Sequence, residues 1–111
     1  MNKEFNCPVE ATISLIGGKY KSVILFHLMG KTLRYSELHK KIPKATDKML
    51  AQQLRELEKD GLIKRTVYPV VPPKTEYNLT EFGESLSPIL NAMCNWGESY
   101  LKIPNQCGEE S

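Results

Sequence analysis

The residues best suited to chemistry lie on the polar face of one predicted helix, which begins near residue 46. Leu50, Leu54 and Leu57 recur at helical spacing and form its apolar stripe. The face opposite this stripe carries Lys48, Ala51, Gln52, Arg55 and Lys59, with Thr46 and Asp47 at its leading end. Glutamine can bond adenine through both amide atoms, arginine can bond guanine or a phosphate, and a small alanine permits contact with a thymine methyl. This face is therefore a candidate surface for contact with DNA bases.

Two helices joined by a tight turn are predicted to position this surface. Thr46 can cap the second helix, because its side chain can accept a hydrogen bond from the first turn, and Gly61 is expected to end it. The helix before it is expected to start at a cap on Ser36 and to end at Pro43. Only about three residues then separate the helices, which is typical of a helix-turn-helix whose second helix enters the major groove.

A hairpin is predicted after these two helices. Residues 63–68 and 75–79 alternate apolar and polar side chains, as strands do. The segment 69–73 joins them, and its prolines favour the tip of a stiff, projecting wing because proline cannot donate to a sheet ladder.

Several polar residues near the start of the helix-turn-helix and beside the hairpin tip suit contacts with DNA. Phosphate contacts position a protein on the duplex without reading its sequence. The predicted contacts outside the second helix are Arg34, Ser36, Lys44 and Lys74. The alternative is that a polar helix face and its neighbouring cations are only solvated, which is the interpretation we prefer for Lys40, Lys41 and Lys59.

The flanking regions are predicted to be helical. Cys7-Pro8 opens a first short helix whose Val9, Ile13 and Ile16 are expected to face the core, and residues 19–29 form a second. Thr80 is expected to cap a long helix over about 80–101 that Pro88 kinks.

This long helix carries more apolar surface than a small body can cover. Its apolar face comprises Phe82, Leu86, Ile89, Leu90, Met93, Trp96 and Tyr100. We therefore expect a two-fold dimer in which partner helices cover each other. The alternative is a helix folded back over the core of its own chain.

Three cysteines raise the possibility of thiol chemistry. Cys7, as the cap of a helix, would place its sulfur at the positive end of the helix dipole, where thiolate is favoured; the alternative is a small, partly buried residue without reactivity. Cys107, in a polar tail, is a second and weaker candidate that could pair with Cys7 across a dimer, whereas Cys94 is expected in the core. Redox sensing is thus a hypothesis centred on Cys7.

Composition and charge narrow the class of protein. The 111 residues, 41% hydrophobic and 25% charged, suit one soluble domain over 1–111, with a DNA-binding core at about 7–80 and short flexible tails. The net charge of +2 divides unevenly: residues 31–65 hold ten Lys/Arg and five Asp/Glu, whereas residues 80–111 hold one Lys and five Glu. No stretch is long and apolar enough to span a membrane, so a cytoplasmic location is expected.

Other kinds of site are disfavoured. The odd cysteine count without a CxxC pair argues against a disulfide scaffold and a four-cysteine metal site, and His27 and His39 lack partners at metal-ligand spacing. No catalytic triad, paired acids or phosphate loop is present, so neither an enzyme nor a cofactor or metal is expected. The expected fold is mainly α with a small β-hairpin, a winged helix-turn-helix with a long C-terminal dimerisation helix.

At the level of motifs, the chain resembles the HxlR-type winged helix-turn-helix transcriptional regulators, relatives of the MarR group. The matching segments are Cys7-Pro8, residues 16–21, Arg34-Tyr35, residues 48–57, Asp60-Gly61-Leu62, residues 71–74, residues 76–80 and Trp96-Gly97. The resemblance implies a homodimer that binds operator DNA as an inverted repeat, more often as a repressor. It also implies that an oxidant or a small electrophile could act through Cys7.

Departures from the family pattern fall at the leading edge of the base-reading helix. Residues 44–47 differ from the common motif, Ala51 stands where Thr is frequent, and Tyr20 stands where Trp is usual. The operator sequence therefore cannot be carried over. A different class of function, a winged helix that binds an acidic protein partner through the same basic face, remains the alternative.

Overall fold

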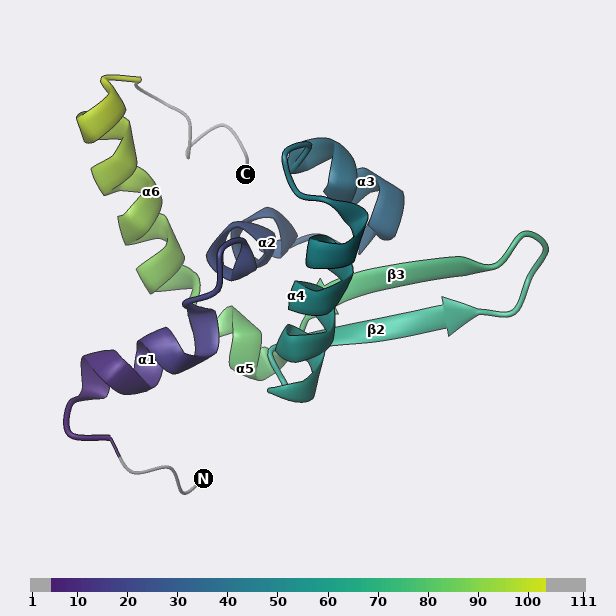
Figure 1. The fold of residues 1–111 in the computed structure, drawn as a ribbon, viewed down its shortest axis with the longest axis horizontal. Coiled ribbons are helices and arrows are strands. Elements are labelled where there is room, and N and C mark those ends of the chain that lie inside the picture. The colour runs from purple at the N-terminus through teal and green to yellow at the C-terminus, as the bar shows by residue number, and fades with distance from the viewer. Residues whose placement is uncertain (1–4, 104–111) are drawn as a thin grey trace.

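The computed structural model describes residues 5–103 as a helical body with a projecting hairpin (Figure 1). The elements within this range are α1 (Pro8–Ile16), α2 (Lys21–Leu28), β1 (Leu33–Arg34), α3 (Tyr35–Lys41), α4 (Asp47–Lys59), β2 (Ile63–Tyr68), β3 (Lys74–Leu79), α5 (Glu81–Glu84) and α6 (Ser87–Leu101). Helices α1 and α6 extend from one end of the molecule, and the hairpin extends from the other. The predicted fold class is confirmed.

The core lies where α2, α3 and α4 pack against one another and against the sheet. Its fully buried side chains include Leu25, Leu38, Leu50 and Leu54. The strands are antiparallel in the order β1-β3-β2, and the hairpin pairs Ile63 with Leu79 at its base. This arrangement holds α4 across the middle of the molecule, between the hairpin and the α1 and α6 end (Figure 1).

The helix predicted over about 80–101 with a kink at Pro88 is instead broken in two, because the chain forms α5 and α6 with residues 85–86 between them. Thr80 does cap α5, since its Oγ1 accepts a hydrogen bond from the Gly83 N–H at 3.0 Å. Pro88 lies in the first turn of α6, where its missing N–H has no partner to lose, whereas it could not continue an unbroken helix from α5. Gly83 packs so closely on the Leu62 carbonyl that a Cβ there would collide with it.

The break also corrects the predicted dimerisation face. Leu86 and Leu90 are 9% and 2% exposed and belong to the core of this chain. The other predicted members, Phe82, Ile89, Met93, Trp96 and Tyr100, are all exposed. The sequence periodicity could not separate these groups because a helix that covers its own core and a second surface is apolar on both sides.

Helix α1 does not face the core as predicted. Val9 is 62% exposed and Ile13 is 56% exposed, and only Ile16, at the C-terminal end of the helix, is buried. The reason is that α1 projects from the body and meets it near that end (Figure 1). Apolar periodicity identified the helix but not what covers its apolar side.

The start of α3 differs from the prediction. The helix begins at Tyr35, so Ser36 lies in its first turn and Arg34 occupies the cap position. The Arg34 backbone N–H donates to Glu37 Oε1 at 2.8 Å. Arg34 also ends β1, where it pairs with Glu76, so the chain passes directly from strand into helix and leaves no turn for Ser36 to cap.

Candidate nucleic-acid interface

Helix α4 presents the predicted polar face to solvent. Thr46 caps it, because Thr46 Oγ1 accepts a hydrogen bond from the Met49 N–H at 3.1 Å. Leu50, Leu54 and Leu57 are at most 1% exposed and anchor the opposite side in the core. The exposed side chains on the polar face are Lys48, Gln52, Arg55 and Lys59, with the half-buried Ala51 among them. The predicted cap, stripe and polar face of this helix are confirmed.

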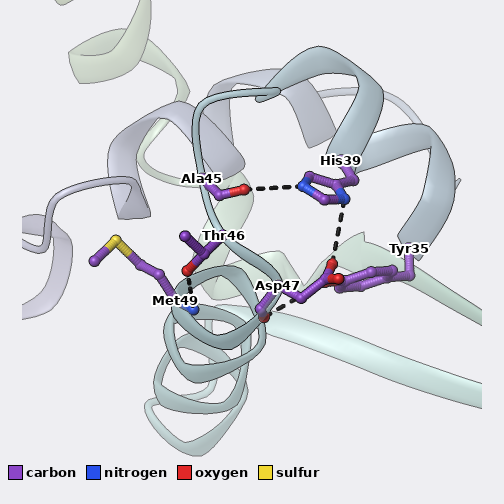
Figure 2. A network of polar contacts seen from close by, with 6 residues as sticks. All are labelled: Tyr35, His39, Ala45, Thr46, Asp47 and Met49. Atoms are coloured by element: carbon purple, nitrogen blue, oxygen red, sulfur yellow. Dashed lines mark hydrogen bonds and ion pairs between the residues drawn. The ribbon is translucent and has the colours of Figure 1, made fainter.

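A polar network closes the turn between α3 and α4 (Figure 2). Tyr35 donates its hydroxyl hydrogen to Asp47 Oδ1 at 2.7 Å, and His39 Nδ1 lies 3.3 Å from the same oxygen. The other ring nitrogen, Nε2, is 2.9 Å from the Ala45 carbonyl oxygen, which can only accept, so Nε2 donates. Burial and the bond to Asp47 raise the pKa of Tyr35 to about 12. This network ties the leading end of α4 to α3.

Residue spacing predicts Asp47 at the DNA-facing end of α4 but does not predict its contacts with Tyr35 and His39. In the structure the Asp47 carboxylate is engaged by α3 while its side chain stays 78% exposed, so its contact with DNA stays a prediction. An aromatic residue and a histidine four positions apart, facing an acidic helix start, were the available signal.

A second set of contacts, also missed in the sequence, fixes α4 against the start of α2. Gln53 Oε1 accepts a hydrogen bond from the Tyr20 N–H at 3.0 Å, and a Cβ at Gly18 would lie 2.6 Å from that oxygen. Glu56 Oε1 lies 2.8 Å from Lys21 Nζ, and Glu56 Oε2 accepts from Gln52 Nε2 at 3.2 Å. The hydrogen bond from Lys21 is the main reason that the pKa of Glu56 is lowered.

The wing meets the start of α3 at an open groove of about 510 Å³. Arg34 at the end of β1 and Ser36 in the first turn of α3 line it, and Lys74 lines it together with the tip of the hairpin. Val71, at that tip, is 98% exposed. The structure thus brings three of the predicted DNA contacts around one groove, whereas Lys44 is exposed in the turn between α3 and α4.

The Lys74 ammonium has two partners on the hairpin. Its Nζ lies 4.9 Å from the centre of the Tyr68 ring and 3.8 Å from Glu76 Oε2. The charge and hydrogen bonding of Glu76 raise the pKa of Tyr68. These contacts hold Lys74 along the hairpin, so its contact with phosphate stays a prediction.

The opposite end of the molecule carries the predicted thiol and the exposed apolar residues. Cys7 occupies the N-cap position of α1 as a free, half-buried cysteine, and its side chain makes no capping hydrogen bond. On α6, the Trp96 and Tyr100 rings stack at 5.4 Å and are 69% and 71% exposed. Cys107 lies outside the described residues, so its pairing with Cys7 is not tested.

Among residues 5–103, no group of three or more His, Cys, Asp or Glu side chains is arranged to hold a metal ion. None of the helices in this range combines the length and apolar content that crossing a bilayer requires.

Comparison with known proteins finds similarity over most of the chain. The HxlR-like helix-turn-helix family model matches residues 15–105. The HTH-type transcriptional regulator YdeP of Bacillus subtilis (strain 168) is 54% identical over 94 residues, which cover 85% of this chain and 73% of that protein. An HTH-type transcriptional regulator of Methanothermobacter thermautotrophicus is 50% identical over 108 residues, covering 97% and 82% of the two chains.

Solved structures agree with this result. The redox regulator HypR in its oxidized form superposes with a TM-score of 0.80 at 50% identity, covering 84% of this chain and 96% of that one. The reduced transcriptional regulator YodB from B. subtilis gives a TM-score of 0.71 at 33% identity, covering 91% and 100%. YdeP, the Methanothermobacter protein and YodB are described as transcriptional regulators and HypR as a redox regulator, none of them as an enzyme, and the resemblance drawn from the sequence motifs is confirmed. The chain belongs to the HxlR-like helix-turn-helix family of DNA-binding transcriptional regulators.

Proposed function

We propose that this chain is a single-domain, homodimeric repressor that binds an inverted-repeat operator and responds to thiol modification at Cys7. The observation that carries the DNA-binding part is the exposed polar face of α4, a capped helix whose other side is fully anchored in the core. A rigidly anchored helix with donors and acceptors on its free side suits insertion into the major groove.

The operator contacts divide into base-reading and positioning groups. Lys48, Ala51, Gln52 and Arg55 face the base edges, with Thr46 and Asp47 at the leading end of the helix. Around the groove beneath the wing and at the turn, Arg34, Ser36, Lys44 and Lys74 contact phosphates. The groove supports this division, because it brings residues of α3 and of the wing to one place.

The dimer is proposed to form through the apolar residues left uncovered at the other end. On α5 and α6 these are Phe82, Ile89, Met93, Trp96 and Tyr100. Val9 and Ile13 of α1 are exposed as well, and we add them to the surface. Large apolar side chains gathered on projecting helices favour burial against a second copy. Two-fold symmetry then places two α4 helices on half-sites separated by whole turns of about 10 base pairs.

Thiol control is proposed from the place of Cys7 and from the relatives. HypR is described as a redox regulator, and YodB from B. subtilis was also solved after diamide treatment. Cys7 is free and shares α1 with the exposed Val9 and Ile13, so a group attached to its sulfur would alter the proposed dimer surface. An electrophile such as a quinone would bond to the Cys7 Sγ, and an oxidant that takes up two electrons would join Cys7 to Cys107 of the other copy with loss of both thiol protons.

Electrophoretic mobility shift with the DNA upstream of the gene, in reducing buffer, tests the DNA-binding part. We expect a specific shift whose affinity falls steeply with salt as condensed counterions are released from DNA. A shift that is indifferent to salt, or no shift at all, would contradict the proposal and favour the binding of an acidic protein partner.

The Cys7→Ser variant tests thiol control. A quinone or diamide should weaken operator binding by the parent protein and leave the variant unaffected. An unchanged response in Cys7→Ser would sink the sensor hypothesis and leave DNA binding intact. The cross-link predicts a dimer band on a denaturing gel that disappears when reductant is added. The same band should be absent from Cys107→Ser.

A further inference from the structure

The charged side chain of Lys21 is buried although nothing in the proposed contacts with DNA uses it. The residue is 8% exposed, and it is the first residue of α2, where the helix dipole disfavours a positive charge. A buried ammonium is tolerated when it is paired and hydrogen-bonded, and here Glu56 of α4 supplies the pair at 2.8 Å. The Glu56 carboxylate is therefore held firmly by a group beneath it.

Glu56 in turn holds the side chain of Gln52, one helical turn before it. Its second oxygen accepts a hydrogen bond from Gln52 Nε2 at 3.2 Å. The bond to Lys21 keeps the pKa of Glu56 low, so the carboxylate is ionised and can only accept hydrogen bonds. The amide nitrogen of Gln52 must then point toward Glu56, and its oxygen must point away from it.

The Gln52 amide oxygen is the acceptor left for an outside partner, beside the second N–H of its amide nitrogen. Gln52 is exposed on the polar face of α4, and within residues 5–103 its Oε1 accepts no hydrogen bond. In the major groove adenine offers a donor at N6 and cytosine a donor at N4, whereas guanine and thymine offer acceptors at the corresponding position. A glutamine that is free to flip its amide could satisfy either kind of base.

We propose that the Lys21–Glu56 pair fixes the amide of Gln52 with its oxygen toward DNA, so that Gln52 selects a base that presents an amino group in the major groove, adenine or cytosine. Lys21 and Glu56 are positioning residues in this scheme, and only Gln52 touches the base. The inference rests on the proposed function, in which α4 enters the major groove. The pair also neutralises an acidic side chain on a helix that approaches phosphates.

Selection of duplexes from a random pool by the parent protein, and by Gln52→Ala, tests the base preference. The position where Gln52→Ala loses discrimination identifies the base that Gln52 contacts, and adenine or cytosine is expected there. Replacing that base by its analogue without the amino group, purine or pyrimidin-2-one, should weaken binding about three- to tenfold, the range of one hydrogen bond.

A double variant, Lys21→Met with Glu56→Gln, tests the positioning role. It removes the buried charge together with its partner, because Glu56→Gln alone would leave the Lys21 ammonium unpaired. The preference for an amino base over guanine or thymine should fall about three- to tenfold at this position and stay unchanged elsewhere in the operator. Glu58→Gln removes an equal charge from an exposed site on α4 and should leave the preference intact.

The outcomes separate this inference from the proposed function. Guanine or thymine at the Gln52 position, no change of preference in Gln52→Ala, or a double variant that folds and retains the full preference would each overturn it while DNA binding stands. If the double variant does not fold, as circular dichroism would show, the analogue duplexes decide with the parent protein alone. Failure to select any duplex would contradict the proposed function itself.

Discussion

The two ends of this molecule differ in how far a single copy of the chain buries its apolar side chains. At α4, every large apolar residue of the helix stripe is buried, and the polar residues are tied to α2 and α3 by hydrogen bonds and an ion pair. At α6, Trp96 and Tyr100 are stacked on each other but about 70% exposed. The α4 end is therefore completed within one copy, whereas the α6 end leaves large apolar side chains exposed.

Basic and acidic residues are also distributed unevenly along the chain. The segment 31–65, which holds α3 and α4, has twice as many basic as acidic residues, whereas residues 80–111 are acidic. A basic end attracts phosphates and an acidic end keeps them away, which orients approach to DNA. A near-neutral total charge thus conceals a basic segment and an acidic one.

The largest expected effect comes from removing an exposed aromatic side chain of α6. Trp96→Ala should weaken dimerisation by about 2 kcal/mol or more for each copy, because exposed aromatic anchors dominate interfaces and two-fold symmetry removes each contact twice. Analytical ultracentrifugation should show monomer at concentrations where the parent protein is dimeric. Val67→Ala removes exposed apolar surface from the wing and should not alter the oligomeric state. Equal dissociation in both variants would refute the distinction between the two ends.

A smaller effect, on affinity for DNA, is expected at the polar face of α4. Arg55→Ala should cost roughly 1–3 kcal/mol of affinity for the operator and less for random duplex, since a contact with a base edge is lost only where that base is present. Fluorescence anisotropy with both duplexes measures the difference. Lys44→Ala removes an exposed cation that is proposed to contact phosphate, in the turn before α4, and should weaken binding to both duplexes alike. Equal losses for Arg55→Ala would assign Arg55 to phosphate instead.

The turn between α3 and α4 should contribute less. Tyr35→Phe removes one hydroxyl that donates to Asp47, and the free energy of unfolding should fall by about 1 kcal/mol, the usual net value of such a bond. Denaturant titration checks this value. Tyr100→Phe changes an exposed hydroxyl on α6 and serves as the control. No difference between these variants would show that the network of Figure 2 does not stabilise the turn.

The smallest expected effect is the dependence of folding stability on acidic pH. The pKa of Glu56 is lowered in the folded chain, so its ionised form stabilises the fold above the ordinary glutamate pKa, and this contribution is lost as pH falls through the lowered value. We therefore expect the stability difference between the parent protein and the Lys21→Met, Glu56→Gln double variant to shrink between about pH 5 and pH 3. Thermal unfolding across this range measures it. A difference that is constant with pH would contradict the assigned role of the ion pair.

The sequence predicted the elements whose signals are local. Thr46 as a cap, Leu50, Leu54 and Leu57 as a buried stripe, and a hairpin with a proline-rich tip all follow from spacing within a few residues, and the structure confirms them. The predicted start of α3 failed because Arg34 belongs both to the end of a strand and to the cap of the helix. Ser36 is a good cap in isolation, but Arg34 ends a strand and starts the helix directly.

Contacts between distant segments were beyond the reach of spacing alone. Lys21 and Glu56 are 35 positions apart, and no periodicity links them, although their ion pair orients the face of α4 that is proposed to read DNA. The engagement of Asp47 by Tyr35 and His39 likewise depends on how α3 crosses the start of α4.

What the sequence determined by itself was the order of elements, the polar face of α4 and the family, because periodicity, caps and motifs are properties of neighbouring residues. Only the tertiary structure decided that Leu86 and Leu90 belong to the core while Val9, Ile13 and Trp96 remain exposed. The physical reason is that hydrophobicity drives an apolar side chain out of water without specifying which surface will cover it. That choice is made by the packing of the whole chain.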